Sequence, residues 1–207
     1  MQLAMLGGSG RIGGHLLTWA LEAGHEVRAL ARTGQSLAPA AGLTVVSGDA
    51  TDGVAVAETV AGADAVFSAL GPRGAKTPHL LASAARETVA AMDKAAIHRL
   101  ICVSAAGAFI QGDPDTGPLM KWVLPRVLAK TFADVREMEA IVAASNLDWT
   151  MVRATRLVDM PLTGKYRVRP DYPPAGGRKI ARADVAHFMA SVLTGGSWVC
   201  QAPALAY

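Results

Sequence analysis

The chain has 207 residues, of which 51% are hydrophobic and 18% charged, so its composition excludes a disordered protein and favours one domain with a substantial buried core. The formal net charge of +3 is scattered along the chain and suits a small anionic ligand as well as nucleic acid. Cys102 and Cys200 are too few for a disulfide framework. The N-terminus has no basic leader, and no apolar run approaches the roughly 18 residues of a membrane span, so we expect a soluble, cytoplasmic protein.

Predicted strands and helices alternate along the chain. Apolar runs predict strands at 2–6, 26–31, 43–47, 65–70, 100–103 and 148–153, and helical spacing predicts helices at 12–23, 54–60, 78–95 and 182–193. The segment 107–118 is rich in Gly, Pro and Asp and is expected to be a loop. The segment 119–145 has helical spacing with a break expected at Pro125.

This alternation predicts the fold class. Strands 65–70 and 100–103 are nearly continuous apolar runs, as expected when helices cover both faces of a sheet. Repeated strand–helix–strand units predict a doubly wound, mostly parallel sheet in a three-layer α/β/α, Rossmann-type fold. We expect a single domain over residues 1–207. The tail has no clear position in the sheet, and residues 154–181 are expected to form a small region on the substrate side.

The segment 7–13, Gly-Gly-Ser-Gly-Arg-Ile-Gly, fits two dinucleotide-binding patterns at once. Gly8, Gly10 and Gly13 satisfy GxGxxG, whereas Gly7, Gly10 and Gly13 satisfy GxxGxxG. In such turns the first glycine permits a sharp turn, the second lets the backbone approach a pyrophosphate, and the third lets the helix pack closely. Because the motif lies between a predicted strand and a predicted helix, it indicates a dinucleotide site, and the alternative is a glycine turn without a ligand.

The residues after the second predicted strand bear on the choice of cofactor. NAD-binding folds place a carboxylate about 20 residues beyond the glycine turn, but this chain has Ala31-Arg32-Thr33. Arg32 can pair with a 2′-phosphate, and Arg11 is expected to point to a similar region. We therefore expect NADPH to bind more tightly than NADH. The alternative is that Arg32 is a solvated residue at a strand end.

Two further segments are expected to lie near the cofactor. Asp49, followed by Ala50, is placed to touch the adenine, or else it is a carboxylate at a helix N-terminus with Thr51 as the cap. Leu70 and Gly71 end the fourth predicted strand at the edge where ligands of open α/β sheets bind, although a plain turn is an equal alternative.

Some chemistry is absent from the sequence. The tyrosines, Tyr166, Tyr172 and Tyr207, have no lysine four positions later, so the chain lacks the Tyr-x-x-x-Lys pair that supplies acid–base catalysis in short-chain dehydrogenases. The five histidines show no metal-ligand spacing, and we expect no metal site.

Three polar residues follow or close strands at the presumed carboxyl edge. Ser104 closes the fifth strand and is a candidate for binding the cofactor amide or the substrate, or for satisfying nearby backbone. Arg153 and Arg156 follow at the sixth strand, where an arginine can stabilise negative charge on a reduced substrate. A surface ion pair is the alternative for these arginines.

Stretches along nearly the whole chain resemble the atypical short-chain dehydrogenase/reductase group, in particular NADPH-dependent flavin reductase, also called biliverdin reductase B, and bacterial NADH-flavin-reductase-like proteins. The matching stretches are GGSGRIG, GHEVRALAR, VVSGD, ADAVFSALGPR, SNLDWTMVR, DMPLTGKYRV and IARADVAHFM. The stretch from Asp159 to Tyr166 resembles the flavin reductase subgroup more specifically.

The resemblance implies a cofactor site and a shallow, tolerant substrate site over the nicotinamide. The implied NADP contacts are Gly7, Ser9, Gly10, Ile12 and Arg32, together with Asp49, Leu70, Gly71 and Arg73. The chain departs from the family at two positions. The family often carries a Ser or Thr pair at the end of the fifth strand, whereas Ala105 follows Ser104 here, and Arg156 stands where the flavin reductase has a histidine.

These features predict an NADPH-dependent reductase that transfers hydride to a flat acceptor such as FMN, riboflavin, a quinone or a tetrapyrrole. Flavin reduction needs no tyrosine, because water can supply the proton while the protein stacks two flat rings. The alternatives are an NADP(H)-binding redox sensor or regulatory protein without turnover and a sugar epimerase or dehydratase. We expect no nucleic-acid or membrane partner, and a monomer or weak homodimer.

Overall fold

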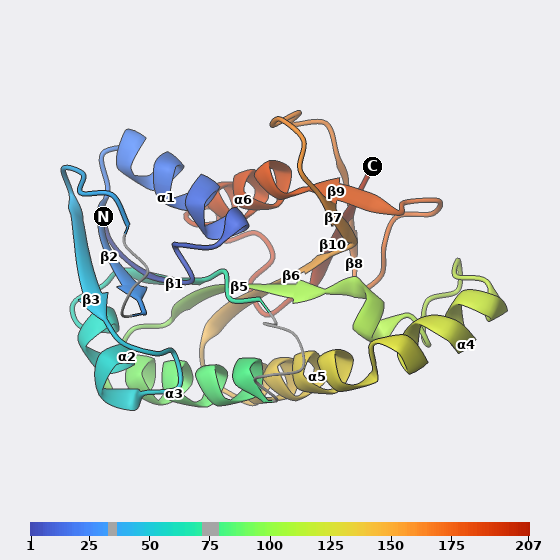
Figure 1. The fold of residues 1–207 in the computed structure, drawn as a ribbon, viewed down its shortest axis with the longest axis horizontal. Coiled ribbons are helices and arrows are strands. Elements are labelled where there is room, and N and C mark those ends of the chain that lie inside the picture. Colours follow the sequence, from blue (N-terminus) through green and yellow to red (C-terminus); the bar gives the residue numbers. More distant parts are fainter. Residues whose placement is uncertain (33–36, 72–78) are drawn as a thin grey trace.

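The computed structural model describes residues 1–32, 37–71 and 79–207 (Figure 1). Its strands are β1 (Gln2–Leu6), β2 (Glu26–Ala31), β3 (Leu43–Ser47), β4 (Ala65–Ser68), β5 (Arg99–Ala105), β6 (Asp148–Ala154), β7 (Arg156–Val158), β8 (Arg167–Pro170), β9 (Lys179–Ala181) and β10 (Pro203–Ala206). Its helices are α1 (Arg11–Glu22), α2 (Gly53–Val60), α3 (Leu80–Lys94), α4 (Pro118–Val127), α5 (Ala129–Ala143) and α6 (Arg182–Ser191), with a short 3-10 helix, η2, at Ala106–Phe109.

Eight of these strands form one twisted sheet in the order β3-β2-β1-β4-β5-β6-β10-β8. Neighbouring strands are parallel throughout, except that β8 runs antiparallel to β10. A second sheet consists of the parallel pair β7 and β9. The strand order reverses direction between β1 and β4, and in open α/β sheets the crevice at such a switch point binds ligands.

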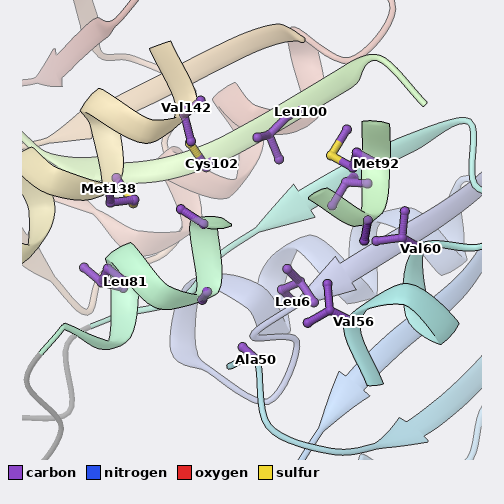
Figure 2. Close-up of a cluster of buried hydrophobic side chains, with 14 of the residues drawn as sticks. Leu6, Ala50, Val56, Val60, Leu81, Met92, Leu100, Cys102, Met138 and Val142 are labelled. Atoms are coloured by element: carbon purple, nitrogen blue, oxygen red, sulfur yellow. The ribbon is translucent and has the colours of Figure 1, made fainter. Parts of the chain in front are cut away.

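Helices cover both faces of the large sheet, with α1 and α6 on one face and α2, α3 and α5 on the other (Figure 1). Alternate strand residues therefore enter different cores. Met5 and Ile101 pack with α1 and α6, whereas Leu6 and Leu100 pack with the other three helices. Figure 2 shows the core on the face covered by α2, α3 and α5, in which strand residues such as Leu6 lie against side chains of these helices. The structure confirms the predicted Rossmann-type α/β fold.

The six strands predicted from apolar runs are all present. β1, β2 and β3 have the predicted bounds, whereas β4 ends two residues earlier than expected, at Ser68. β5 is longer than the run 100–103 and ends at Ala105, which brings Ser104 into the sheet opposite Arg153 of β6.

The expected helix break at Pro125 is wrong. Pro125 lies inside α4, and the chain bends three residues later, at Leu128, before α5 begins. Proline has no N–H to bond the carbonyl four residues earlier, which belongs to Lys121. The Gln111 side chain donates to that carbonyl at 2.7 Å, so the helix continues past the proline with the acceptor satisfied.

The C-terminal tail contributes more to the sheet than its sequence pattern indicated. β10 lies beside β6 and all four of its residues are buried, and β8 adds the antiparallel edge strand. These strands have only four residues each and both contain a proline, so neither gives a recognisable alternating pattern.

Candidate cofactor and substrate site

The glycine turn connects β1 to α1 beside the carboxyl end of β4. Gly7 has φ +86°, a left-handed conformation that glycine adopts at no steric cost, and a Cβ there would lie 2.8 Å from the carbonyl oxygen of Ala69. A Cβ on Gly13 would lie 2.0 Å from the carbonyl oxygen of Gly7. At Gly8 the nearest atom to an added Cβ is the flexible Met5 sulfur at 3.3 Å. The geometry therefore requires glycine in the GxxGxxG register more strictly than in GxGxxG.

The N-terminus of α1 has the form of an anion site. Gly10 is the N-cap residue, its N–H donates to the Gly7 carbonyl at 2.9 Å, and within the described part of the chain no side chain caps the helix. The first N–H groups of an α-helix have no intrahelical acceptor, and the helix dipole places partial positive charge on them. Ile12 is buried beneath this turn, so the backbone and not a side chain faces a ligand there.

Arg11 joins the glycine turn to the C-terminal region. Its guanidinium donates to Asp159 at 2.9 Å, and Asp159 also accepts from Arg182 at 2.7 Å. Partial desolvation would raise the pKa of Asp159, but the two guanidinium groups hold it below its usual value. Arg11 thus contacts the start of the DMPLTGKY stretch, whereas the sequence suggested that it points toward a 2′-phosphate.

Arg32 follows β2 directly and is half-buried. Its Nε atom is buried and has no hydrogen-bond partner among the residues that the structure describes. A buried, unpaired guanidinium N–H is costly unless a ligand satisfies it, and a phosphate oxygen is a strong acceptor for such a group. The residues present therefore fit a cofactor that carries a phosphate beside β2.

The other expected cofactor contacts surround this turn. The Asp49 carboxylate accepts from the Thr51 N–H at 3.0 Å and from its hydroxyl at 2.8 Å. The cap of α2 is Asp52, which accepts from the Val54 N–H at 3.0 Å, so the alternative with Thr51 as the cap is wrong. Ala50 is buried in the core, which leaves its backbone alone to contact a ligand.

At the end of β4, the Leu70 side chain packs against the core and Gly71 is exposed. Ser9 has interactions within the protein. Arg73 and Thr33 lie outside the described residues.

A buried polar cluster lies at the carboxyl ends of β5 and β6. The Ser104 hydroxyl donates to Glu139 of α5, and the Arg153 guanidinium donates to both oxygens of the same carboxylate, at 3.0 and 2.6 Å. Arg153 also donates to the Asp171 carbonyl at 2.8 Å and stacks on the Phe109 ring at 3.7 Å. The hydroxyl proton of Ser104 is therefore committed to a carboxylate, so Ser104 presents acceptor lone pairs to any neighbour.

A cavity of about 510 Å³ opens next to this cluster. Glu139, Arg153 and Phe109 line it at the carboxyl-edge end, and Trp149 and Cys200 line it toward the start of β6. Sequence reasoning missed Glu139. The available signal was a charged residue within the apolar face of α5, where Val135, Met138 and Val142 are buried on either side of it.

Arg156 lies apart from this cluster. It begins β7, is exposed, and pairs in register with Lys179 of β9. Its side chain has no hydrogen bond or ion pair with any other residue within 1–32, 37–71 and 79–207. Its exposed guanidinium is therefore free to meet a ligand at the start of β7.

Asp184 anchors the DMPLTGKY stretch and was also missed. It is fully buried and accepts from the Thr163 N–H and hydroxyl, the Gly164 N–H and the Tyr207 hydroxyl. Burial alone would raise the pKa of Asp184, but these donors hold it below its usual value. Tyr166, at the end of the stretch, bonds His187 at 2.8 Å, and burial together with Asp184 raises its pKa to about 12.

Metal-ligand clusters and membrane-spanning helices are both lacking among the described residues. These residues contain no group of three or more His, Cys, Asp or Glu side chains placed to hold a metal ion. None of the helices formed by these residues has the length and apolar character needed to cross a membrane.

The glycine turn, the uncapped helix and the unpaired arginine beside β2 together define a nucleotide-binding Rossmann protein. Residues 7–195 match the model of the NAD(P)H-binding family, and the chain belongs to this family.

Solved structures share the fold over the full chain. A short-chain dehydrogenase/reductase from Veillonella parvula in complex with NADP is 20% identical with a TM-score of 0.83, covering 100% of this chain and 94% of that one. ChuY, an anaerobilin reductase from Escherichia coli O157:H7, is 24% identical with a TM-score of 0.83 and covers 100% and 97%. A putative exported protein from Burkholderia pseudomallei is 25% identical with a TM-score of 0.83, covering 100% of both chains.

A curated relative with a local match is a 3-beta-hydroxysteroid dehydrogenase from Mycolicibacterium neoaurum, 46% identical over 66 residues. This match covers 32% of the chain and only 18% of the relative's length.

Proposed function

We propose that the protein is an NADPH-dependent reductase that transfers hydride to a flat acceptor such as a flavin, a quinone or a tetrapyrrole. The observation that carries the proposal is a nucleotide site with an unpaired arginine beside β2, in a chain without a Tyr-x-x-x-Lys pair. ChuY, whose fold this chain shares, is an anaerobilin reductase, which is consistent with a tetrapyrrole as the acceptor.

The preference for NADPH rests on Arg32. The N–H groups at the start of α1 bind the pyrophosphate, and Arg32 binds the 2′-phosphate through its fork of donors. No carboxylate stands at positions 31–33 to hold a ribose 2′-hydroxyl or repel the phosphate. The NADP complex of the Veillonella protein supports this choice, whereas NADH is expected to bind more weakly.

Two of the tyrosines, Tyr166 and Tyr207, have hydroxyls that are engaged within the protein. The Tyr166 and Tyr207 hydroxyls bond His187 and Asp184, and the pKa of both phenols is raised. The Ser104 hydroxyl donates a hydrogen bond to Glu139, so it can only accept a hydrogen bond from a ligand. Bound NADPH supplies the hydride, and an acceptor that takes its proton from water needs only to be stacked and oriented at the carboxyl edge.

Residues 154–181 and Arg156 provide the substrate side in this proposal. Asp184 accepts hydrogen bonds from the loop that precedes β8. Arg11 and Arg182 both donate to Asp159, at the start of this loop. Arg156 is an exposed cation in this region and can stabilise negative charge on a reduced acceptor.

The test is a turnover assay with pure protein, NADPH or NADH, and FMN, riboflavin, a quinone or biliverdin, following the loss of NAD(P)H absorbance. We expect turnover with at least one acceptor and about tenfold higher kcat/KM for NADPH than for NADH. Arg156→Ala should lower the rate, whereas Lys94→Ala, which removes an exposed cation at the far end of α3, should not. Tight NADPH binding with no turnover for any acceptor would instead favour an NADP(H)-sensing protein.

A further inference from the structure

Helix α4 is an unusually exposed apolar element. None of its residues is buried, and Leu119, Val127 and Trp122 are 74%, 72% and 59% exposed. Figure 1 shows α4 extending away from the sheet, beyond the end of α5. Its Leu124 packs against the core, which attaches one side of the helix to the body of the protein. Large exposed apolar side chains gathered on one element mark an interaction surface.

The charge of this element is uniformly positive. Lys121, Arg126 and Lys130 lie on or just after α4, and there is no Asp or Glu between positions 116 and 133. None of the three cations forms an ion pair with another residue that the structure describes. Arg126 stacks on the Trp122 ring at 4.5 Å, so the aromatic ring and a cation occupy the same exposed patch.

These properties distinguish between two occupants. A second copy of the chain, packed isologously through α4, would bring three cations against the same three cations without an intervening carboxylate on the helix. An anionic lipid surface instead attracts all three, while Trp and aliphatic side chains enter the boundary between headgroups and acyl chains. Charge complementarity therefore favours the lipid surface.

We propose that α4 is a membrane-surface helix that docks the protein on anionic phospholipid. This inference does not depend on the proposed reductase activity, and it revises the expectation that the protein has no membrane partner. The helix lies on the bilayer and does not cross it, which agrees with the lack of a spanning helix among the described residues. Because α4 follows β5 through η2, docking holds the carboxyl edge of the sheet near the lipid surface.

Cosedimentation of the 207-residue protein with vesicles tests the proposal. Vesicles of phosphatidylcholine with phosphatidylglycerol are compared with pure phosphatidylcholine, at low and high salt. We expect binding only to the anionic vesicles, weakened by salt. Two variants, Leu119→Ser/Trp122→Ser/Val127→Ser and Lys121→Glu/Arg126→Glu/Lys130→Glu, should each bind about tenfold more weakly or worse.

Control variants carry changes of the same kind elsewhere. Val54→Ser removes an exposed apolar side chain on α2, and Lys94→Glu/Arg178→Glu/Lys179→Glu makes the same change in net charge away from α4; both should bind like the parent. Circular dichroism and urea denaturation verify folding of each variant.

A second measurement follows insertion of α4 directly and needs only the conservative variant Trp122→Phe as its reference. Quenching of the Trp122 fluorescence by brominated lipid, taken as the difference from Trp122→Phe, reports insertion directly. Absence of binding to anionic vesicles, equal loss in the controls, or no quenching of Trp122 would overturn the proposal. A dimer in sedimentation that the serine variant dissociates would also overturn it, in favour of a second copy as the occupant.

Discussion

Individual glycines in the nucleotide turn have different physical roles, and these roles are separable by mutation. Gly13 faces the Gly7 carbonyl so closely that any Cβ would have to move backbone, whereas Gly14, one residue later in α1, has no atom within 4 Å of an added Cβ. The two positions therefore form a natural pair for testing whether the turn needs its present shape.

Gly13→Ala should destabilise the protein by about 1–3 kcal/mol, because the overlap with the Gly7 carbonyl forces the backbone apart. It should also weaken NADPH binding, since the displaced N–H groups are those that face the phosphates. Gly14→Ala should stabilise the protein by about 0.5–1 kcal/mol, because alanine replaces glycine inside a helix. Urea denaturation and NADPH titration measure both effects, and equal behaviour of the two variants would show that the close packing is unimportant.

The candidate site could be predicted at residue level only where the signal was local. The glycine turn and Arg32 lie within short motifs whose meaning depends on spacing along the chain. Glu139 and Asp184 could not be found in this way, because their partners lie 14 to 35 and 20 to 23 residues away and meet them only when the sheet has formed. A charged residue inside an apolar helix face was the signal that these positions offered.

Among the elements, the loop between β7 and β8 depends on one carboxylate. The folded-state pKa of Asp184 lies below its usual value because four donors outweigh the effect of burial. A carboxyl with a lowered pKa stabilises the fold at pH values above its unfolded-state pKa, and this contribution is lost as the pH falls through the folded-state value.

Asp184→Asn should therefore lower the free energy of unfolding by about 1–3 kcal/mol near neutral pH. The difference from the parent should begin to shrink as the pH falls below about 4, the pKa of the carboxyl in the unfolded state, and should vanish once the pH falls below the lower pKa of the folded state. Urea denaturation at pH 7 and near pH 3 provides the comparison, with Asp93→Asn, an exposed position on α3, as the control. A difference that stays the same at both pH values would show that the charge of Asp184 does not contribute.

Element boundaries were predictable where propensity and packing agree. β1, β2 and β3 carry apolar runs between turn residues, and their bounds follow from the sequence. The helix break predicted at Pro125 does not occur, because the backbone carbonyl that the proline leaves without a donor accepts a hydrogen bond from Gln111 in the preceding loop. Sequence periodicity contains no information about such a partner.

At the level of the whole molecule, the alternating elements predicted the parallel sheet but not its full extent. β10 and β8 join the sheet beside β6 through pairing with segments distant in sequence, and neither is long enough to give a periodic pattern. Their addition places the DMPLTGKY stretch, through Asp159, against the glycine turn. The fold thereby brings the nucleotide turn and the C-terminal region to one edge.

The proposed function requires a phosphorylated adenine nucleotide to bind between the N-terminus of α1 and the unpaired Arg32. Titration calorimetry with NADPH and NADH, on the parent protein and on Arg32→Asp, measures this most directly. We predict a dissociation constant about tenfold lower for NADPH than for NADH in the parent, because of the charged pair with the 2′-phosphate, and a ratio near one or reversed in the variant. Equal dissociation constants for the two cofactors in the parent, or no binding of either, would contradict the account.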